Sequence, residues 1–420
     1  MTEPSQSASF LFEQKRQEIQ RSFPVMVKPA GSLCNLDCDY CYYLEKSALY
    51  PDKQVLLSSF KMPEILSEKL IREYIQTQSG QQAEFIWHGG EPALPGMDYF
   101  RKITGWQKKY ANGKKIINAF QTNGTLINDE WAEFLATNHF FCGLSIDGPR
   151  KLHDKHRRFP NGQGSWEKAA NCASLFRKHG VEFNILSVVN ATNSKQPAAV
   201  YEFLKSLGTP FIQFTPIAER ITLEVSEELS IVSNDYSGET AFMRENVNAE
   251  DWGNFLCRVF DLWIKQDVGR YFINYFDNTL AAYAGQAPAL CTMAPCCACT
   301  PAIEHNGDVY CCDHFVFPEY KLGNITSGSL RDMVKSDPQL FFEQRKQDTL
   351  SQTCRSCEFL FTCGGDCPKN RFTPNGEDFP ISCLCEGFRH FFRHSRKHFE
   401  FMANELKHHR APANIMNTKI

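Results

Sequence analysis

Apolar residues follow two alternating spacings along the first two thirds of the chain. Short apolar runs typical of buried strands are each followed by a stretch with the period of about 3.6 residues that indicates an amphipathic helix. The expected strands cover 25–28, 83–90, 116–124, 141–148, 181–190 and 211–217. The expected helices cover 62–78, 97–110, 128–138, 165–179, 196–207 and 252–266. Strands that are apolar on both faces and alternate with helices predict a parallel sheet covered by helices.

The residues that follow each strand indicate where a site would form. The strands end in glycine, proline or polar clusters, namely KPAGS, HGGEP, QTNG, SIDGP, VVNATN and TPIAER. In barrels, the loops after the strands gather the active site, whereas an open doubly wound sheet would also fit the pattern. A polar segment at 219–250 interrupts the alternation, and beyond about residue 270 it fails while cysteines become frequent.

Composition narrows the class of protein. The chain has 420 residues, of which 42% are hydrophobic, so it is long enough for two domains with their own cores. A net charge of −3, without runs of like charge, argues against nucleic acid or a membrane surface as partner. The N-terminus lacks an apolar signal segment and no stretch is long enough to span a membrane, so we expect a cytoplasmic protein. Eighteen cysteines in such a chain favour metal ligation over disulfides.

Three cysteines follow the first expected strand within one short loop. Cys34, Cys38 and Cys41 stand at C-x3-C-x2-C spacing in SLCNLDCDYCYYL, close enough to reach one inorganic centre. A closed zinc site needs four ligands, and no further Cys or His follows Cys41 before His88. A three-thiolate set fits a 4Fe–4S cluster that keeps one iron open for chemistry. Three unrelated buried thiols are the alternative.

This motif, with the aromatic Tyr40 before its last cysteine, resembles the signature of radical S-adenosylmethionine (SAM) enzymes. In that family the open iron binds SAM, and reduction of the cluster cleaves SAM to methionine and a 5′-deoxyadenosyl radical. The resemblance implies that the cofactor supplies the chemistry, while the protein aims the radical and keeps it from water. It also implies a partial (β/α)6 barrel whose six strand-end loops surround one mouth.

A second group of twelve cysteines lies between Cys291 and Cys385. It includes the segment CTMAPCCAC and a C-x2-C-x5-C-x3-C motif that begins at Cys354. Eight of these thiols would complete two four-thiolate sites. Their spacing alone leaves open whether the sites hold two iron–sulfur clusters or two zinc ions.

The second group resembles the SPASM extension of peptide-modifying radical SAM enzymes, which carries two auxiliary 4Fe–4S clusters with four protein ligands each. The resemblance implies a first auxiliary cluster held by Cys291, Cys297, Cys312 and Cys367. It implies a second held by Cys354, Cys357, Cys363 and Cys385. Cys296 and Cys311 each precede an expected ligand, so a shift of the ligand set by one residue stays open, and Cys299 and Cys383 have no role in this scheme.

Residues at the strand ends are candidates for SAM binding. Glycines at 89 and 90 let the backbone approach a ligand closely, and GGEP matches the SAM motif of the family. The cofactor-binding set implied by the resemblance comprises Tyr40, His88, Gly89, Gly90, Glu91, Ser145 and Arg157. Many relatives carry Gln in place of His88, which leaves its role open between a SAM contact and a gate to the substrate pocket. The run at 152–158 is expected as an exposed charged loop, unless Arg157 meets a carboxylate.

Asp313 is the carboxylate that we single out as a proton acceptor. It follows the expected ligand Cys312, so its backbone is fixed where the second domain faces the barrel mouth. A carboxylate there could take a proton from a thiol or hydroxyl while a hydrogen atom leaves the neighbouring carbon. The alternative is a carboxylate that caps a nearby backbone N–H, and Asp277 is the competing candidate.

The ordered set of motifs between about residues 24 and 408 resembles the anaerobic sulfatase-maturating enzymes, which oxidise a Cys or Ser of an unfolded sulfatase to Cα-formylglycine. The set comprises LCNLDCDYCYYLEK, WHGGEP, FQTNGTLI, LSIDGP, HDKHRR, FNILSVVN, IQFTPIAER, NGDVYCCDHFV and CGGDCPKNRF. By this resemblance Asp313 accepts the proton, and Tyr43 and Gln121 lie near the substrate side chain. It also implies SAM, three 4Fe–4S clusters, a sulfatase polypeptide as substrate and a flavodoxin- or ferredoxin-type electron donor.

The expected domains are an N-terminal extension at 1–23, the barrel at 24–269, the SPASM domain at 270–386 and a C-terminal helix and tail at 387–420.

Two alternatives to sulfatase maturation stay open: a SPASM enzyme that crosslinks another ribosomal peptide, and a zinc-bearing module without catalysis. The sequence does not decide between Cys and Ser as the target, nor the sulfatase, the reductant or the oligomeric state.

Overall fold

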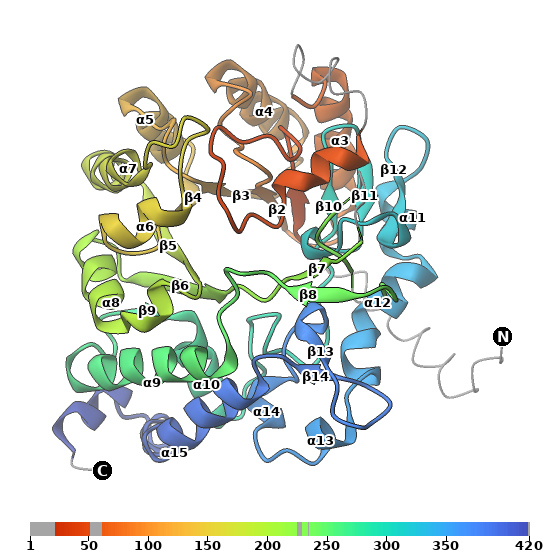
Figure 1. Ribbon diagram of the computed structural model, residues 1–420. Helices are drawn as coiled ribbons and strands as arrows, with labels where there is room; N and C mark the ends of the chain where they lie inside the picture. Colours follow the sequence, from red (N-terminus) through yellow and green to blue (C-terminus); the bar gives the residue numbers. More distant parts are fainter. Residues whose placement is uncertain (1–21, 51–60, 225–228, 234, 419–420) are drawn as a thin grey trace.

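A curved sheet of mostly parallel strands forms the centre of the molecule (Figure 1). The computed structural model describes residues 22–50, 61–224, 229–233 and 235–418, so most of the expected N-terminal extension lies outside the described residues. The strand order is β12-β11-β10-β1-β2-β3-β4-β5-β6-β9. The six barrel strands are β1 (Val25–Val27), β2 (Gln82–Trp87), β3 (Lys115–Thr122), β4 (Phe140–Ser145), β5 (Glu182–Val189) and β6 (Phe211–Pro216). They pair in parallel from β1 to β6.

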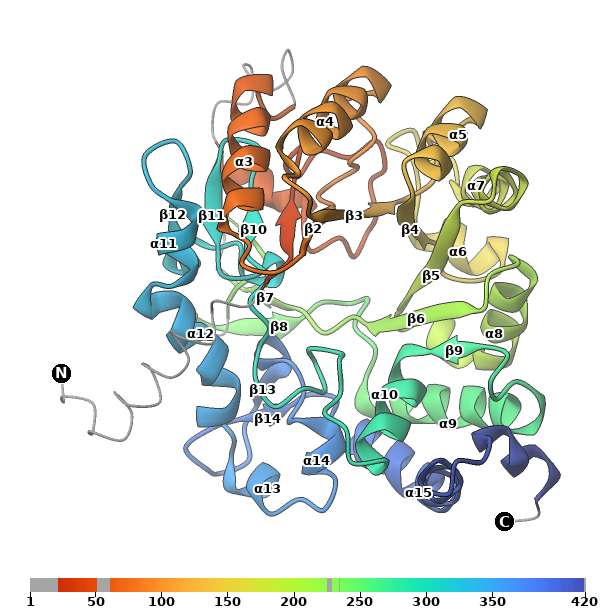
Figure 2. The same ribbon diagram turned by 180° about the vertical axis from the view of Figure 1, so that it is seen from behind.

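Helices line the outer side of the curved sheet, as Figures 1 and 2 show from opposite sides. They are α3 (Glu64–Thr77), α4 (Met97–Tyr110), α5 (Asp129–Thr137), α7 (Trp166–His179), α8 (Pro197–Ser206) and α9 (Ala249–Gln266). Each predicted strand and helix of the barrel is present, with ends that differ by a few residues. The predicted α/β class with a parallel sheet is therefore confirmed.

The charged run at 152–158 is not the exposed loop that the sequence predicts. It forms most of α6 (Arg150–His156) and the residues that follow it, and His153, His156 and Arg157 are buried. The prediction was wrong because each of these polar side chains finds a partner inside the barrel mouth, which offsets the cost of burying it. The stated alternative, in which Arg157 meets a carboxylate, is the one observed.

The polar segment after β6 adds a hairpin rather than a barrel unit. Its strands are β7 (Arg220–Thr222) and β8 (Thr240–Phe242), which pair antiparallel. A short 3-10 helix (Asn193–Lys195) precedes α8. The hairpin lies between the barrel and the C-terminal part of the chain (Figure 1).

The C-terminal part continues the central sheet on both edges. Strand β9 (Phe272–Ile273) pairs with β6, and β10 (Ala302–Ile303) pairs with β1. The remaining strands are β11 (Asp308–Tyr310), β12 (Lys321–Asn324), β13 (Arg371–Thr373) and β14 (Ile381–Ser382). The helices are α10 (Asn274–Tyr283), α11 (Leu330–Val334), α12 (Asp337–Asp348), α13 (Gln352–Arg355), α14 (Leu360–Cys363) and α15 (Cys385–Lys407), with 3-10 turns at Leu44–Leu49, Asp313–Phe315, Pro318–Tyr320, Pro368–Asn370 and Pro412–Asn417.

The long C-terminal helix α15 packs on α9 through two glycines. A Cβ atom at Gly387 would lie 2.1 Å from the carbonyl oxygen of Ala249, and one at Gly253 would lie 2.8 Å from the carbonyl oxygen of Gly387. Glycine at both places therefore allows the two backbones to touch.

Among the described helices, none combines the length and the apolar character that crossing a membrane requires.

Candidate active site

The loop after β1 brings three thiols together at the mouth of the barrel. The electrostatic interactions of Cys38 include both Cys34 and Cys41. Burial raises the pKa of all three thiols, that of Cys34 to about 12. Thiolates at this place therefore need a positively charged partner, and a metal cluster is one. The donor set fits the cluster that the motif predicts.

The loop after β2 lies directly against the cysteine loop. Gly90 N–H donates to the carbonyl of Gly31 at 2.9 Å, and Glu91 N–H donates to the carbonyl of Leu33 at 2.7 Å. A Cβ atom at Gly90 would lie 1.8 Å from the Leu33 oxygen, so only glycine fits. The backbone of GGEP thus holds the cysteine loop in place.

Glu91 is fully buried below this contact. Its carboxylate accepts hydrogen bonds from Thr122 Oγ1 at 2.8 Å and from the backbone N–H groups of Asn123 and Ala93. Burial raises the pKa of Glu91 to about 7, although these hydrogen bonds oppose the shift. Glu91 therefore joins the ends of β2 and β3.

Arg157 and Asp147 form a buried ion pair beside the cysteine loop. Arg157 Nε donates to Asp147 Oδ2 at 2.8 Å, and the guanidinium lies 5.5 Å from the ring centre of Tyr40. The hydroxyl of Tyr40 donates to the same carboxylate, and Val188 N–H donates to its other oxygen at 2.9 Å. Burial would raise the pKa of Asp147, but Arg157 holds it below its usual range.

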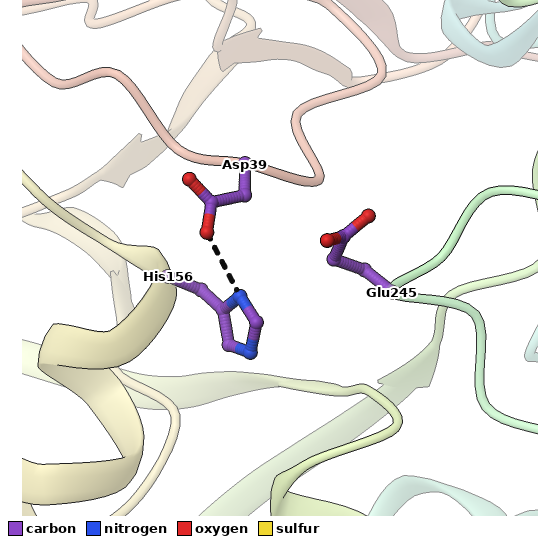
Figure 3. A group of neighbouring side chains, drawn as sticks. All are labelled: Asp39, His156 and Glu245. Atoms are coloured by element: carbon purple, nitrogen blue, oxygen red, sulfur yellow. Dashed lines mark hydrogen bonds and ion pairs between the residues drawn. The ribbon is translucent and has the colours of Figure 1, made fainter.

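A second polar contact ties the cysteine loop to α6. Asp39 accepts from His156 Nδ1 at 3.1 Å and from Arg158 Nη2 at 2.7 Å. Glu245 faces this pair from the segment after β8, and ligand atoms of the three residues lie within 4.8 Å of one another (Figure 3). Because Arg158 neutralises Asp39, and Thr192 Oγ1 lies 3.0 Å from His156 Nε2, this group is better explained as a clamp than as a cation site.

Asp313 lies in a partly buried group of polar side chains between β1 and the C-terminal part. Tyr42 hydroxyl donates to Asp313 Oδ2 at 2.8 Å, and Lys28 Nζ lies 3.7 Å from the same oxygen. Lys28 is fully buried and also lies 3.3 Å from His88 Nδ1. Burial alone would raise the pKa of Asp313, but the nearby His314 and Lys28 depress it well below its usual range. The carboxylate is therefore ionised at neutral pH.

Burial, and then the charge of Lys28, lower the pKa of His88 to about 3. The ring is therefore neutral at physiological pH. His88 faces Lys28 and the Asp313 group, so the structure places it on the side of the candidate proton acceptor.

Two further residues expected near the substrate have partners within the protein. Tyr43 is buried, and its hydroxyl donates to Glu304. Gln121 Nε2 donates to Ser145 Oγ at 3.0 Å, across the ends of β3 and β4. The competing acid Asp277 lies on α10, where burial raises its pKa to about 7.

Thiols of the expected first auxiliary set lie close enough to one another to interact electrostatically. The electrostatic interactions of Cys312 include Cys367 and Cys291, and those of Cys367 include Cys297. Cys296 instead turns its Sγ towards Gln347 Oε1, at 3.8 Å. The second member of this cysteine pair thus faces the other thiols.

The second auxiliary set lines one cavity of about 350 Å³ between α13, α14 and α15. Its four thiols are Cys354, Cys357, Cys363 and Cys385. Burial raises the pKa of Cys363 and Cys385 to about 12. Four thiols that converge on one cavity fit a site completed by metal ions.

Sequence reasoning missed Lys28, Tyr42 and His314, which surround Asp313. The ring of Tyr42 packs on His314, with 4.8 Å between the ring centres. A lysine at the end of an apolar strand was the one signal for Lys28, because such a charge is buried only with partners.

Comparison with known proteins identifies two domain families in the chain. Residues 29–204 match the radical SAM superfamily, and residues 291–358 match the SPASM iron–sulfur cluster-binding domain. The chain is 46% identical, over 93% of its length and 94% of the relative, to a serine-type anaerobic sulfatase-maturating enzyme of Bacteroides thetaiotaomicron. It is 33% identical, over 92% of its length and 98% of the relative, to a cysteine-type enzyme of Clostridium novyi.

A solved structure agrees with these relatives. Native anSMEcpe with bound AdoMet and Cp18Cys peptide matches with a TM-score of 0.77 and 28% identity, over 92% of this chain and 99% of that one. With the grouped thiols and the partly buried Asp313 carboxylate at the barrel mouth, these likenesses show that the chain belongs to the radical SAM family of anaerobic sulfatase-maturating enzymes.

Proposed function

We propose that this chain oxidises the Cβ of a serine in an unfolded sulfatase segment to the aldehyde of Cα-formylglycine. The observation that carries the proposal is the partly buried Asp313 carboxylate, which is ionised and held by Tyr42 and Lys28 next to the thiol of Cys312. A base at that place can take a proton from the target side chain.

The cofactors fit the thiol sets described above. We assign one 4Fe–4S cluster to Cys34, Cys38 and Cys41, one to Cys291, Cys297, Cys312 and Cys367, and one to Cys354, Cys357, Cys363 and Cys385. The first cluster, together with SAM, would supply the radical chemistry needed to take one hydrogen atom from the substrate. Tyr40, His88, Gly89, Gly90, Glu91, Ser145 and Arg157 are proposed to shape the SAM site, either directly or by holding its loops.

The residues of the chain then complete the oxidation. The target loses a hydrogen atom from Cβ, and its hydroxyl proton passes to Asp313. A cluster held by Cys291, Cys297, Cys312 and Cys367 would serve as the acceptor of the remaining electron. Lys28 and Tyr42 hold the carboxylate in place while it accepts the proton. Tyr43 and Gln121 are proposed to act near the target side chain, in support of Asp313.

Serine is proposed as the target because identity to the serine-type relative, at 46%, exceeds identity to the cysteine-type relative, at 33%.

A flavodoxin- or ferredoxin-type protein is proposed as electron donor, and the cytoplasm as location. The proposed domains are 24–269 and 270–386. They share one sheet, because β10 pairs with β1 and β9 pairs with β6.

The proposal is tested with synthetic peptides that carry S-x-A-x-R or C-x-P-x-R. Reduced, reconstituted enzyme and SAM should convert the serine peptide to an aldehyde, seen as loss of two hydrogens by mass spectrometry. Asp313→Ala should abolish the aldehyde. Unchanged peptide despite SAM cleavage would favour the modification of another ribosomal peptide.

A further inference from the structure

A small cavity is bordered by His314 and by Tyr42, the residue whose hydroxyl binds Asp313. Its volume is about 20 Å³, which holds roughly one water molecule or the oxygen end of one polar group. The lining residues that matter here are Lys46, Tyr42, Glu219, Arg220, His314, Phe317 and Lys369. They come from the cysteine loop, the β7–β8 hairpin and the SPASM domain, so three separate parts of the chain meet there.

Lys46 is the unusual member of this group. Its side chain is 1% exposed, and its Nζ finds no hydrogen-bond acceptor among the described residues. The ammonium rests on the ring of Phe317, 3.4 Å from the ring centre. A cation–π contact leaves the three N–H donors of an ammonium without acceptors, so burial of this charge is only partly offset.

The acidic side chains closest to Lys46 have other partners. Glu219 accepts from Lys369 at 2.7 Å, and Glu45 accepts from the backbone N–H of Ile231 at 2.7 Å. Glu319 accepts from Ser233 Oγ at 2.5 Å. These carboxylates balance part of the charge but do not reach the ammonium.

The rest of the cavity wall is also rich in donors. Arg220 adds a second cation, and its Nη2 donates to the carbonyl of Ser233 at 2.8 Å. Nδ1 of His314 is buried and likewise has no hydrogen-bond partner among the described residues. The wall thus holds three cations, Lys46, Arg220 and Lys369, against one carboxylate, Glu219, which Lys369 already pairs, so it keeps an excess of positive charge and the free donors of Lys46.

We propose that this cavity, which we call the Lys46 subsite, binds a carboxylate of the substrate polypeptide close to the target residue. A carboxylate oxygen fits the volume, pairs with the free ammonium and satisfies its unused donors. Tyr42 joins the subsite to Asp313, because its ring borders the cavity and its hydroxyl binds the proton acceptor. This inference rests on the proposed function, because it assigns the binding of a substrate carboxylate to the same barrel mouth that holds Asp313.

The carboxylate could come from an Asp or Glu side chain or from the C-terminus of a short peptide. A scan distinguishes these sources: Glu and Gln are compared at each position on both sides of the target serine, and the amidated C-terminus is compared with the free acid. At one position, the wild-type enzyme should prefer Glu over Gln by about tenfold in kcat/KM, mainly through KM, with the preference falling at high salt. A preference for the free acid alone would assign the subsite to the C-terminus.

Lys46→Met should remove the preference for Glu over Gln peptides, while the Gln peptides are processed as before. The control variant Lys102→Met, at a surface residue, should keep the preference. A wild-type scan without any preference for a carboxylate, or a preference that survives in Lys46→Met, would overturn the proposal. Because the wild-type scan stands alone, the proposal stays testable even if the variant folds poorly. If no peptide becomes an aldehyde, the proposed function fails; if all become aldehydes at equal rates, only the subsite fails.

Discussion

Lys28 Nζ lies 3.7 Å from Asp313 Oδ2, although Lys28 follows the first strand and Asp313 lies in the C-terminal domain. The pairing of β10 with β1, and of β11 with β10, brings the two residues together. The shared sheet thus places the proposed proton acceptor of one domain at the mouth of the other.

Lys28→Met should impair the proton acceptor without removing it. Lys28 lowers the pKa of Asp313, so its loss should raise that pKa and move the acidic limb of the pH–kcat profile to higher pH. Lys28 is also one of the two groups that hold the Asp313 carboxylate in place, so its loss should misplace the proton acceptor. For that reason we expect kcat at neutral pH to fall by about tenfold, with less change in KM for the peptide. A profile identical to that of the wild type would contradict this role, and Lys102→Met serves as control.

Lys46→Met should stabilise the protein. Burial lowers the pKa of Lys46 to about 8, so the folded state binds fewer protons than the unfolded state between about pH 8 and 10.5. The cost of burying the charged Lys46 ammonium therefore lowers the free energy of unfolding fully below pH 8, and this loss of stability fades as the pH rises towards 10.5. We expect the variant to be more stable by about 2 kcal/mol at pH 7, with the gap narrowing above pH 8. Denaturant unfolding at pH 7 and pH 9.5 measures this, and an equal gap at both would contradict the account.

Asp147→Asn should destabilise the fold because it leaves the Arg157 guanidinium buried without its counter-charge. Loss of one partner from a buried ion pair costs about 3–5 kcal/mol. Asp98→Asn is the matched control, since Asp98 pairs with Arg101 on the surface and should matter little. Equal melting temperatures for the two variants would show that the Asp147 pair does not support the mouth.

Cys297→Ala and Cys296→Ala separate the two possible ligand registers. Cys297 faces the other auxiliary thiols, whereas Cys296 turns towards Gln347. After anaerobic reconstitution, Cys297→Ala should hold about four irons fewer than the wild type, and Cys296→Ala should match it. The reverse result would shift the ligand set by one residue.

Much of the barrel follows from the sequence because its strands are apolar on both faces and its helices on one. The glycines at 89 and 90 stood out in the sequence because the family motif lies at the end of a strand. The close contact of Gly90 with the Leu33 carbonyl explains why a glycine is needed at position 90. Cysteine spacing and resemblance together predicted iron–sulfur clusters, which agrees with the match of residues 291–358 to an iron–sulfur cluster-binding domain.

The surroundings of Asp313 were not predictable in the same way. Tyr42, Lys28 and His314 come from three separate segments, and only tertiary pairing brings them to one carboxylate. Helix α6 was missed because a run of charges usually faces solvent, whereas here the charges meet partners inside the mouth.

The most direct test of the account follows deuterium from the target residue. A peptide with deuterium at Cβ of its serine is incubated with reduced enzyme and SAM, and the 5′-deoxyadenosine and the aldehyde are both measured by mass spectrometry. We predict one deuterium in 5′-deoxyadenosine for each aldehyde formed, and loss of the aldehyde in Asp313→Asn. Aldehyde formed without deuterium in 5′-deoxyadenosine, or at the wild-type rate in Asp313→Asn, would contradict the account.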